Sequence, residues 1–404
     1  MAILYKSFYS TKEHGRNLFP PEGGDWRPCS QSCAIIRTMR IDDFEVKRLD
    51  SKSCSVVQYK GDDENIAIPE KLGKYSTVRI EASLVRRGLK ARSISIPASI
   101  SEIDEDLFPS LKYLERFEVA KGSLSFRAED GILYDSSCYS LIFYPPAKED
   151  GTFVLPKRLG RVAGTAFSAG AKIETIQYGS KLEEFQALPS QLPRFSAFVP
   201  SDDAPDYEGV LIKGKKLLFY PPKREGASYV IPDGVEEIYS LSQEPFFPKS
   251  VKNLYVPSSM KKGLERALCN AVKVDVDSHN ATYRSIDGVL YSWKRVLLSY
   301  PGERRDGVYV TASGTDRIGS GAFRLSRLET LVLSNGVTAI GDSAFASSAI
   351  STLVIPSTVS EIDIHAFFSA ENLKEVFVEK GSVAELFLRA DGKERIIRVV
   401  PSLF

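Results

Sequence analysis

Residues 317–382 contain one sequence pattern three times: RIGSGAFRLSRLETLVLSNGVTA, then IGDSAFASSAISTLVIPSTVSE, then IDIHAFFSAENLKEVFVEKGS. The Ala-Phe pairs of the three copies begin at residues 322, 344 and 366, so the period is 22 residues. A fixed period in the twenties, with apolar residues at recurring positions, is typical of a solenoid in which each repeat forms one coil. We therefore predict that this stretch folds as stacked coils.

Each copy contains an apolar-x-x-apolar-x-apolar segment, at residues 328–333, 350–355 and 373–378. The last two apolar residues of each segment are two apart, as in a strand with one buried face. The residue between them, which is Val332, Val354 or Phe377, is then expected to face the opposite side, along the inner surface of a curved sheet.

The phenylalanines of the Ala-Phe pairs, Phe323, Phe345 and Phe367, are expected to stack as a ladder at the back of the coils. A single coil of this size cannot bury its own apolar face, so its stability must come from its neighbours. The prediction is one continuous hydrophobic interior shared by successive coils.

Residues 353–362, LVIPSTVSEI, followed by Ala366-Phe367, resemble the BspA-type leucine-rich repeat family, whose pattern is close to L-x-x-L-x-I-P-x-x-V-x-x-I-G-x-x-A-F. The resemblance implies a β-rich, right-handed leucine-rich repeat solenoid with a parallel sheet on its concave side, inserted β-hairpins and a cap at each end. It also implies a non-enzymatic role in surface adhesion, with a host or matrix protein as the partner.

A longer repeat is superimposed on the short one. The segments DGILY (130–134), EGVLI (208–212) and DGVLY (287–291) are each followed by an apolar segment that ends in Tyr-Pro. Short polar turns separate the two halves of each unit, so each unit is predicted to be a β-hairpin.

The repeat pattern divides the chain into two parts. Residues 1–42 do not match it and form an N-terminal extension, whereas residues 43–404 form the repeat domain. A first hairpin is expected to cap its N-terminal end, and a helix and strand after Gly381-Ser382 its C-terminal end. Caps are expected because an open solenoid end exposes apolar surface and unpaired strand edges.

The charge composition gives no indication of nucleic acid as a partner. Lys and Arg number 53 against 52 Asp and Glu, for a formal net charge of +1, and the small basic patches are offset by acidic ones. No apolar run reaches the length of a membrane span. The N-terminus lacks the apolar core of a secretory signal, so the sequence as given predicts a cytoplasmic protein. The alternative, secretion or cell-surface display, is common in the family it resembles.

Motifs that suggest chemistry have simpler interpretations. Gly209-x-x-x-x-Gly214-Lys215-Lys216 is close to a phosphate-binding loop, but it lacks the Ser or Thr and the following helix that such a loop needs. His14, Cys29 and Cys33 have a spacing that fits zinc ligation poorly. Asn280-Ala281-Thr282 is a glycosylation sequon by pattern.

The three histidines lie apart, and His365 is interpreted as a surface or packing residue. We therefore predict no catalytic residue, no metal and no cofactor. The five cysteines are odd in number and scattered, and they imply no disulfide framework.

The best functional indication is the residue in the middle of each predicted strand. In the C-terminal half these residues are apolar or aromatic, and an exposed stripe of that kind is typical of protein recognition. The candidate binding residues are Tyr255, Tyr309, Val332, Val354 and Phe377. An alternative is that strands simply favour such residues.

The leading hypothesis is thus a binding scaffold that holds a protein or peptide, with a glycan as a further option. The runner-up is an intracellular interaction module. The rival from another class is a hydrolase with a site in residues 1–42 or in the irregular segment 186–206. Oligomeric state cannot be predicted from this pattern.

Overall fold

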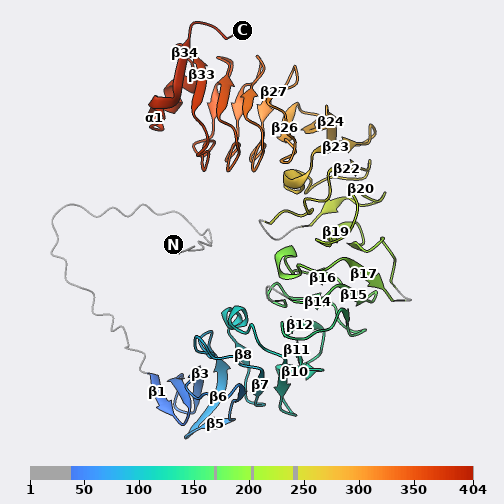
Figure 1. Cartoon of the computed structure of the whole chain (residues 1–404), viewed down its shortest axis with the longest axis vertical. Helices are drawn as coiled ribbons and strands as arrows, with labels where there is room; N and C mark the ends of the chain where they lie inside the picture. Colours follow the sequence, from blue (N-terminus) through green and yellow to red (C-terminus); the bar gives the residue numbers. More distant parts are fainter. Residues whose placement is uncertain (1–37, 168–170, 202–203, 240–243, 404) are drawn as a thin grey trace, which may run out of the picture. The chain divides into compact units, whose positions relative to one another are not determined.

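The computed structural model describes residues 38–167, 171–201, 204–239 and 244–403. It is a β-solenoid, as predicted (Figure 1). Each coil contributes one strand to a parallel sheet that we call the main sheet, and most coils contribute a second, shorter strand to another parallel sheet, the short sheet.

The main sheet is divided into four sections along the chain. The first section contains β4 (Asn65–Ala67), β7 (Ser93–Ile96) and β9 (Arg116–Val119), and the second β13 (Thr152–Val154), β15 (Thr175–Tyr178) and β17 (Ala197–Pro200). The third contains β20 (Ser228–Val230), β22 (Asn253–Val256) and β23 (Lys273–Val276). The fourth, orange to red in Figure 1, contains β27 (Val308–Val310), β29 (Thr330–Val332), β31 (Thr352–Ile355), β33 (Glu375–Glu379) and β34 (Ile397–Val400).

The short sheet is likewise divided. Its sections are β6 (Tyr75–Ile80) with β8 (Glu102–Ile103); β12 (Ser140–Phe143), β14 (Arg161–Val162) and β16 (Glu184–Phe185); β19 (Lys216–Phe219) with β21 (Glu237–Ile238); and β26 (Val296–Ser299), β28 (Arg317–Ile318), β30 (Ala339–Ile340) and β32 (Glu361–Ile362). Short 3-10 helices lie between strands at Glu105–Ser110, Pro189–Gln191, Ala267–Asn270 and Glu394–Ile396.

The core between the two sheets contains the predicted aromatic ladder. The ring centroids of Phe323 and Phe345 are 6.1 Å apart, and those of Phe345 and Phe367 are 5.3 Å apart. Tyr300 extends the ladder at one end and Phe387 at the other. These spacings are close to the separation of neighbouring strands, so the prediction of a shared interior is confirmed.

The three predicted hairpins are present, and they divide the main sheet. β11 (Ile132–Asp135) pairs antiparallel with β12, β18 (Leu211–Lys213) with β19, and β25 (Val289–Ser292) with β26. Before the first and third hairpins the chain adds the strands β10 (Phe126–Glu129) and β24 (Tyr283–Ile286).

A tight turn at the start of each hairpin unit closes the preceding section of the main sheet. Asp130 and Gly131 have φ of 50° and 75°, as a type I′ turn requires. The Gly131 carbonyl accepts a hydrogen bond from the Phe117 N–H of β9, and an added Cβ on this glycine would lie 2.6 Å from the Cβ of Arg116. The turn therefore covers an edge that would otherwise be open for pairing.

Both ends of the solenoid are capped. The N-terminal cap contains β1 (Thr38–Ile41), β2 (Phe44–Arg48), β3 (Ser53–Tyr59) and β5 (Lys71–Leu72), which form one sheet with β6. Because β1 pairs with β2, the ordered cap begins before Asp43, at which the sequence pattern starts.

The C-terminal cap is the helix α1 (Val383–Ala390), followed by β34 parallel to β33. The Ser382 hydroxyl accepts a hydrogen bond from the Glu385 N–H, and the Glu385 carboxylate accepts one from the Gly381 N–H. These two bonds satisfy N–H groups at the helix start that have no partner within the helix. Ala384 and Leu388 are buried in the same core cluster as the aromatic ladder.

Candidate functional site

The exposed face of the main sheet is built by strand register. In the four strands β27, β29, β31 and β33, a residue that points into the core is followed by one that points outward. Parallel pairing aligns Val310 with Val332, Val332 with Val354, and Val354 with Phe377. We call these four side chains the C-terminal row.

The structure places four of the five predicted binding residues on this exposed face. Val332, Val354 and Phe377 are partly exposed members of the C-terminal row, and Tyr255 lies on the third section with 43% of its surface exposed.

The assignment of Tyr309 to the exposed face is wrong. Tyr309 is only 7% exposed and pairs in register with the core residue Leu331, so it points into the interior. Its ring packs against Tyr300, with centroids 5.0 Å apart, and burial raises the pKa of its hydroxyl well above the ordinary value. The exposed residues of this strand are its neighbours Val308 and Val310, which are 60% and 54% exposed.

The character of the main-sheet face changes along the chain. In the first section it is polar and its groups bond to one another: the Ser93 hydroxyl donates to the Asn65 side chain at 2.7 Å, and the Ser95 hydroxyl to Glu118 at 2.9 Å. In the fourth section the C-terminal row is apolar, and Thr330 and Thr352 lie beside it. An ion pair of 3.1 Å between Arg398 and Glu375 ends this apolar stretch.

The short-sheet face is different, because its charges neutralise one another across coils. Arg79 pairs with Glu102 at 3.0 Å, Arg161 with Glu184 at 3.4 Å, and Arg317 with Glu361 at 2.9 Å. Lys216 and Lys262 both pair with Glu237. Exposed pairs contribute little to stability, but they balance the charges along this face.

The lysines of the loop that resembles a phosphate-binding loop have protein partners. Lys213 donates to the Ser180 carbonyl, Lys215 pairs with Glu236 at 2.6 Å, and Lys216 follows in the strand β19. The loop is the turn of the hairpin formed by β18 and β19. The segment 186–206, proposed as an enzyme site, contributes β17 to the main sheet, whereas His14, Cys29 and Cys33 lie outside the described residues.

The sequon asparagine is a structural residue. Asn280 is 1% exposed, and its side-chain amide donates hydrogen bonds to the carbonyls of Pro257 and Met260, at 2.8 and 2.9 Å. Its side-chain oxygen accepts from the N–H groups of Thr282 and Tyr283. The folded chain therefore does not present this nitrogen to a modifying enzyme.

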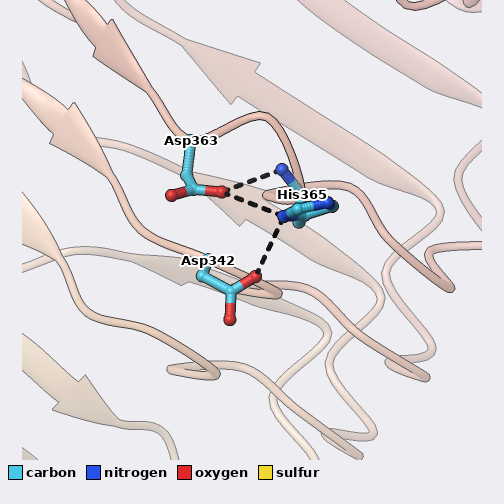
Figure 2. Close-up of side chains that lie close together, drawn as sticks. All are labelled: Asp342, Asp363 and His365. Carbon is cyan, nitrogen blue, oxygen red and sulfur yellow. Dashed lines mark hydrogen bonds and ion pairs between the residues drawn. The ribbon is translucent and has the colours of Figure 1, made fainter. Parts of the chain in front are cut away.

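A cluster of polar side chains that sequence reasoning missed lies where adjacent coils turn (Figure 2). His365 Nδ1 is 3.8 Å from Asp363 Oδ1 and 3.9 Å from Asp342 Oδ1, and all three side chains are exposed. Asp342 precedes the other two by about one repeat, so only the stacking of coils brings it near them.

Comparison with known proteins agrees with this fold. Residues 309–386 match the model of the BspA type leucine rich repeat region, with six copies. No curated protein gives a significant sequence match. Within the described residues, no helix is both long and apolar enough to cross a membrane.

Among solved structures, the chain is similar to the pneumococcal vaccine antigen PcpA, with 18% identity, coverage of 85% of this chain and 82% of that chain, and a TM-score of 0.33. It is also similar to a leucine-rich repeat protein from Eubacterium ventriosum, with 13% identity, coverage of 84% and 77%, and a TM-score of 0.37. A third is a leucine rich cell surface protein from Faecalibacterium prausnitzii, with 14% identity, coverage of 85% and 89%, and a TM-score of 0.29.

Proposed function

Because residues 309–386 belong to the BspA-type leucine-rich repeat family, we propose that this chain is a non-catalytic scaffold that binds a protein or peptide on the C-terminal row. Repeat proteins of this architecture present extended surfaces, and binding on such a surface needs shape and apolar area more than reactive groups.

The observation that carries the proposal is the contrast between the two faces of the same coils. On the short-sheet side Arg317 and Glu361 neutralise each other, whereas on the main-sheet side Val310 is exposed and Val332 and Val354 are partly exposed. Covering such side chains is favourable by roughly 25 cal/mol per Å² of apolar surface. Val332 and Val354 are held by the rigid sheet, so their ordering costs a partner little.

The strand preference of β-branched residues explains why valine is tolerated in the C-terminal row. It does not explain why apolar residues occupy the same position in four neighbouring strands. The first section of the same sheet carries Ser95 and Glu118 at equivalent positions and is equally regular. An apolar row is therefore not a requirement of the fold, which favours recognition as its reason.

The partner we favour is an extracellular one, such as a host or matrix protein, because that is the role the family resemblance implies. The second candidate, an intracellular interaction module, would use the same surface.

Capture of partners tests the proposal. Immobilised wild-type chain is compared with the immobilised variant Val332→Lys/Val354→Lys. A basement-membrane protein extract and a cell lysate are applied to each in separate experiments. The control is Arg317→Ala/Glu361→Ala, which alters the short-sheet face of the same coils. We expect the lysine variant to lose the proteins captured by wild type and the control to keep them. Equal capture by all three chains would refute the proposal.

A further inference from the structure

We infer that Asp342, Asp363 and His365 form a binding site for a divalent transition-metal ion of the Zn²⁺ type. This inference does not depend on the proposed function, because the cluster lies at a turn between coils and not on the main-sheet face (Figure 2).

The geometry is close to what such an ion needs. One imidazole nitrogen and two carboxylate oxygens lie within 4.8 Å of one another. Zinc bonds of about 2.0 to 2.2 Å in a tetrahedral arrangement place ligand atoms about 3.4 Å apart. The distances of 3.8 and 3.9 Å from His365 Nδ1 to the two carboxylates therefore need only small side-chain rotations. All three side chains are exposed, which makes such rotations inexpensive.

The two carboxylates lack the partner that most acidic groups on this surface have. Within the described part of the chain, neither Asp342 nor Asp363 forms an ion pair with a lysine or arginine, and the one basic group that faces both is His365. Asp363 Oδ1 accepts the backbone N–H of His365 at 2.8 Å, and Asp342 Oδ1 accepts the Ser343 hydroxyl at 3.0 Å. A carboxylate oxygen has more than one lone pair, so each of these oxygens can also bind a cation.

The repeat separates the roles of these residues. Asp363 takes the place of Gly319 and Gly341 in the two preceding coils, and His365 takes the place of Gly321 and Ser343. Asp104 fills the place of Asp363 in the coil of β8, where its carboxylate accepts the Asp106 N–H as Asp363 accepts the His365 N–H. Asp363 thus also stabilises its turn, whereas the sister coils of the fourth section form this turn without a histidine. One imidazole and two carboxylates therefore lie together at this turn of the fourth section.

The donor set selects among metals. Ca²⁺ prefers six to eight oxygen ligands and Mg²⁺ retains most of its water, so neither gains from an imidazole. Zn²⁺ binds nitrogen and carboxylate oxygen together, with water completing its coordination.

The test is calorimetric titration of the whole chain with Zn²⁺, in a Cys29→Ser/Cys33→Ser background that removes competing thiols. The variants His365→Ser and Asp363→Gly restore residues that the sister coils carry, so both are expected to fold, and thermal unfolding in the presence of a chelator checks this. The matched control is His279→Ser, because His279 is an exposed histidine that faces a single carboxylate, Asp277, at 3.1 Å.

We expect one Zn²⁺ site, with an affinity reduced about tenfold or more by either cluster variant, which is a loss of about 1.4 kcal/mol or more. The control should bind as the parent does, and Ca²⁺ should bind more weakly than Zn²⁺. An unchanged isotherm for His365→Ser, no Zn²⁺ binding by the parent, or Ca²⁺ binding as tight as Zn²⁺ would each overturn the inference.

Discussion

The hydroxyl oxygens of Tyr291 and Tyr309 lie 2.9 Å apart in the core, where the third hairpin meets the fourth section of the main sheet. The Ala312 N–H also donates to the Tyr291 hydroxyl, at 3.2 Å. The same place in the preceding hairpin unit is filled by Ile212 and Tyr229, and the buried Tyr229 hydroxyl has no hydrogen-bond partner among the described residues.

Removal of a tyrosine hydroxyl is therefore expected to change the free energy of unfolding differently at positions 309 and 229. Tyr309→Phe removes a buried hydrogen bond and should lower the free energy of unfolding by about 1 to 2 kcal/mol. Tyr229→Phe removes a hydroxyl that is buried without a partner, and should leave the free energy of unfolding unchanged or raise it. Urea unfolding of both variants measures the difference. Equal destabilisation would contradict the assigned hydrogen bond.

The aromatic ladder predicts that replacing a buried phenylalanine lowers the free energy of unfolding much more than replacing an exposed one. Phe345 is 1% exposed and stacks between two coils, so Phe345→Ala should cost about 3 to 5 kcal/mol of unfolding free energy. Phe368, which is 65% exposed, serves as the control, and Phe368→Ala should change stability by less than about 0.5 kcal/mol. Similar losses at both positions would show that the ladder is not the shared interior.

Two variants of the sequon distinguish a structural role of Asn280 from a role as a glycosylation site. Asn280→Ala removes four hydrogen bonds at a buried position, so we expect a loss of about 2 to 4 kcal/mol of unfolding free energy. Thr282→Ala abolishes the sequon but keeps the Asn280 side chain. Thermal unfolding should show a clear drop for the first variant and little change for the second; the reverse order would refute the structural role.

Buried tyrosines predict a loss of stability in alkali. Burial raises the pKa of Tyr178 to about 12, and burial also raises the pKa values of Tyr229 and Tyr309 above the ordinary value. In the unfolded chain these phenols ionise near pH 10. Their contribution is therefore complete below about pH 10 and is lost as pH rises above it, by up to about 1.4 kcal/mol per pH unit for each tyrosine.

Phenolate absorbance followed together with far-UV circular dichroism checks this alkaline transition. The buried tyrosines should ionise only as the chain unfolds. Ionisation of all tyrosines while the circular dichroism is unchanged would contradict the burial.

The short period was sufficient to predict the coils, because Leu331, Leu333 and Phe323 recur at positions that only a stacked interior explains. The side of the strand on which Tyr309 points was not predictable from local alternation. The segment Val308-Tyr309-Val310 is apolar at every position, so no alternation of apolar and polar residues shows which of its side chains face the core. Register with the next coil decides it, since Tyr309 pairs with Leu331.

The Asp342, Asp363 and His365 cluster was missed in the sequence for a related physical reason. Asp342 lies in a different coil from the other two, and the turn residues of neighbouring repeats differ, so no motif marks it. Aligning the turns of successive coils, and not only their apolar residues, would have brought these three side chains together.

The central claim, that the C-terminal row is the binding surface, is tested most directly by photo-crosslinking from two positions of one coil. A benzophenone amino acid replaces Val354 on the main sheet or Glu361 on the short sheet, and each chain is irradiated with the captured partner. We predict a covalent adduct with the partner from position 354 and none from position 361. An adduct from position 361 alone, or equal adducts from both, would contradict the account.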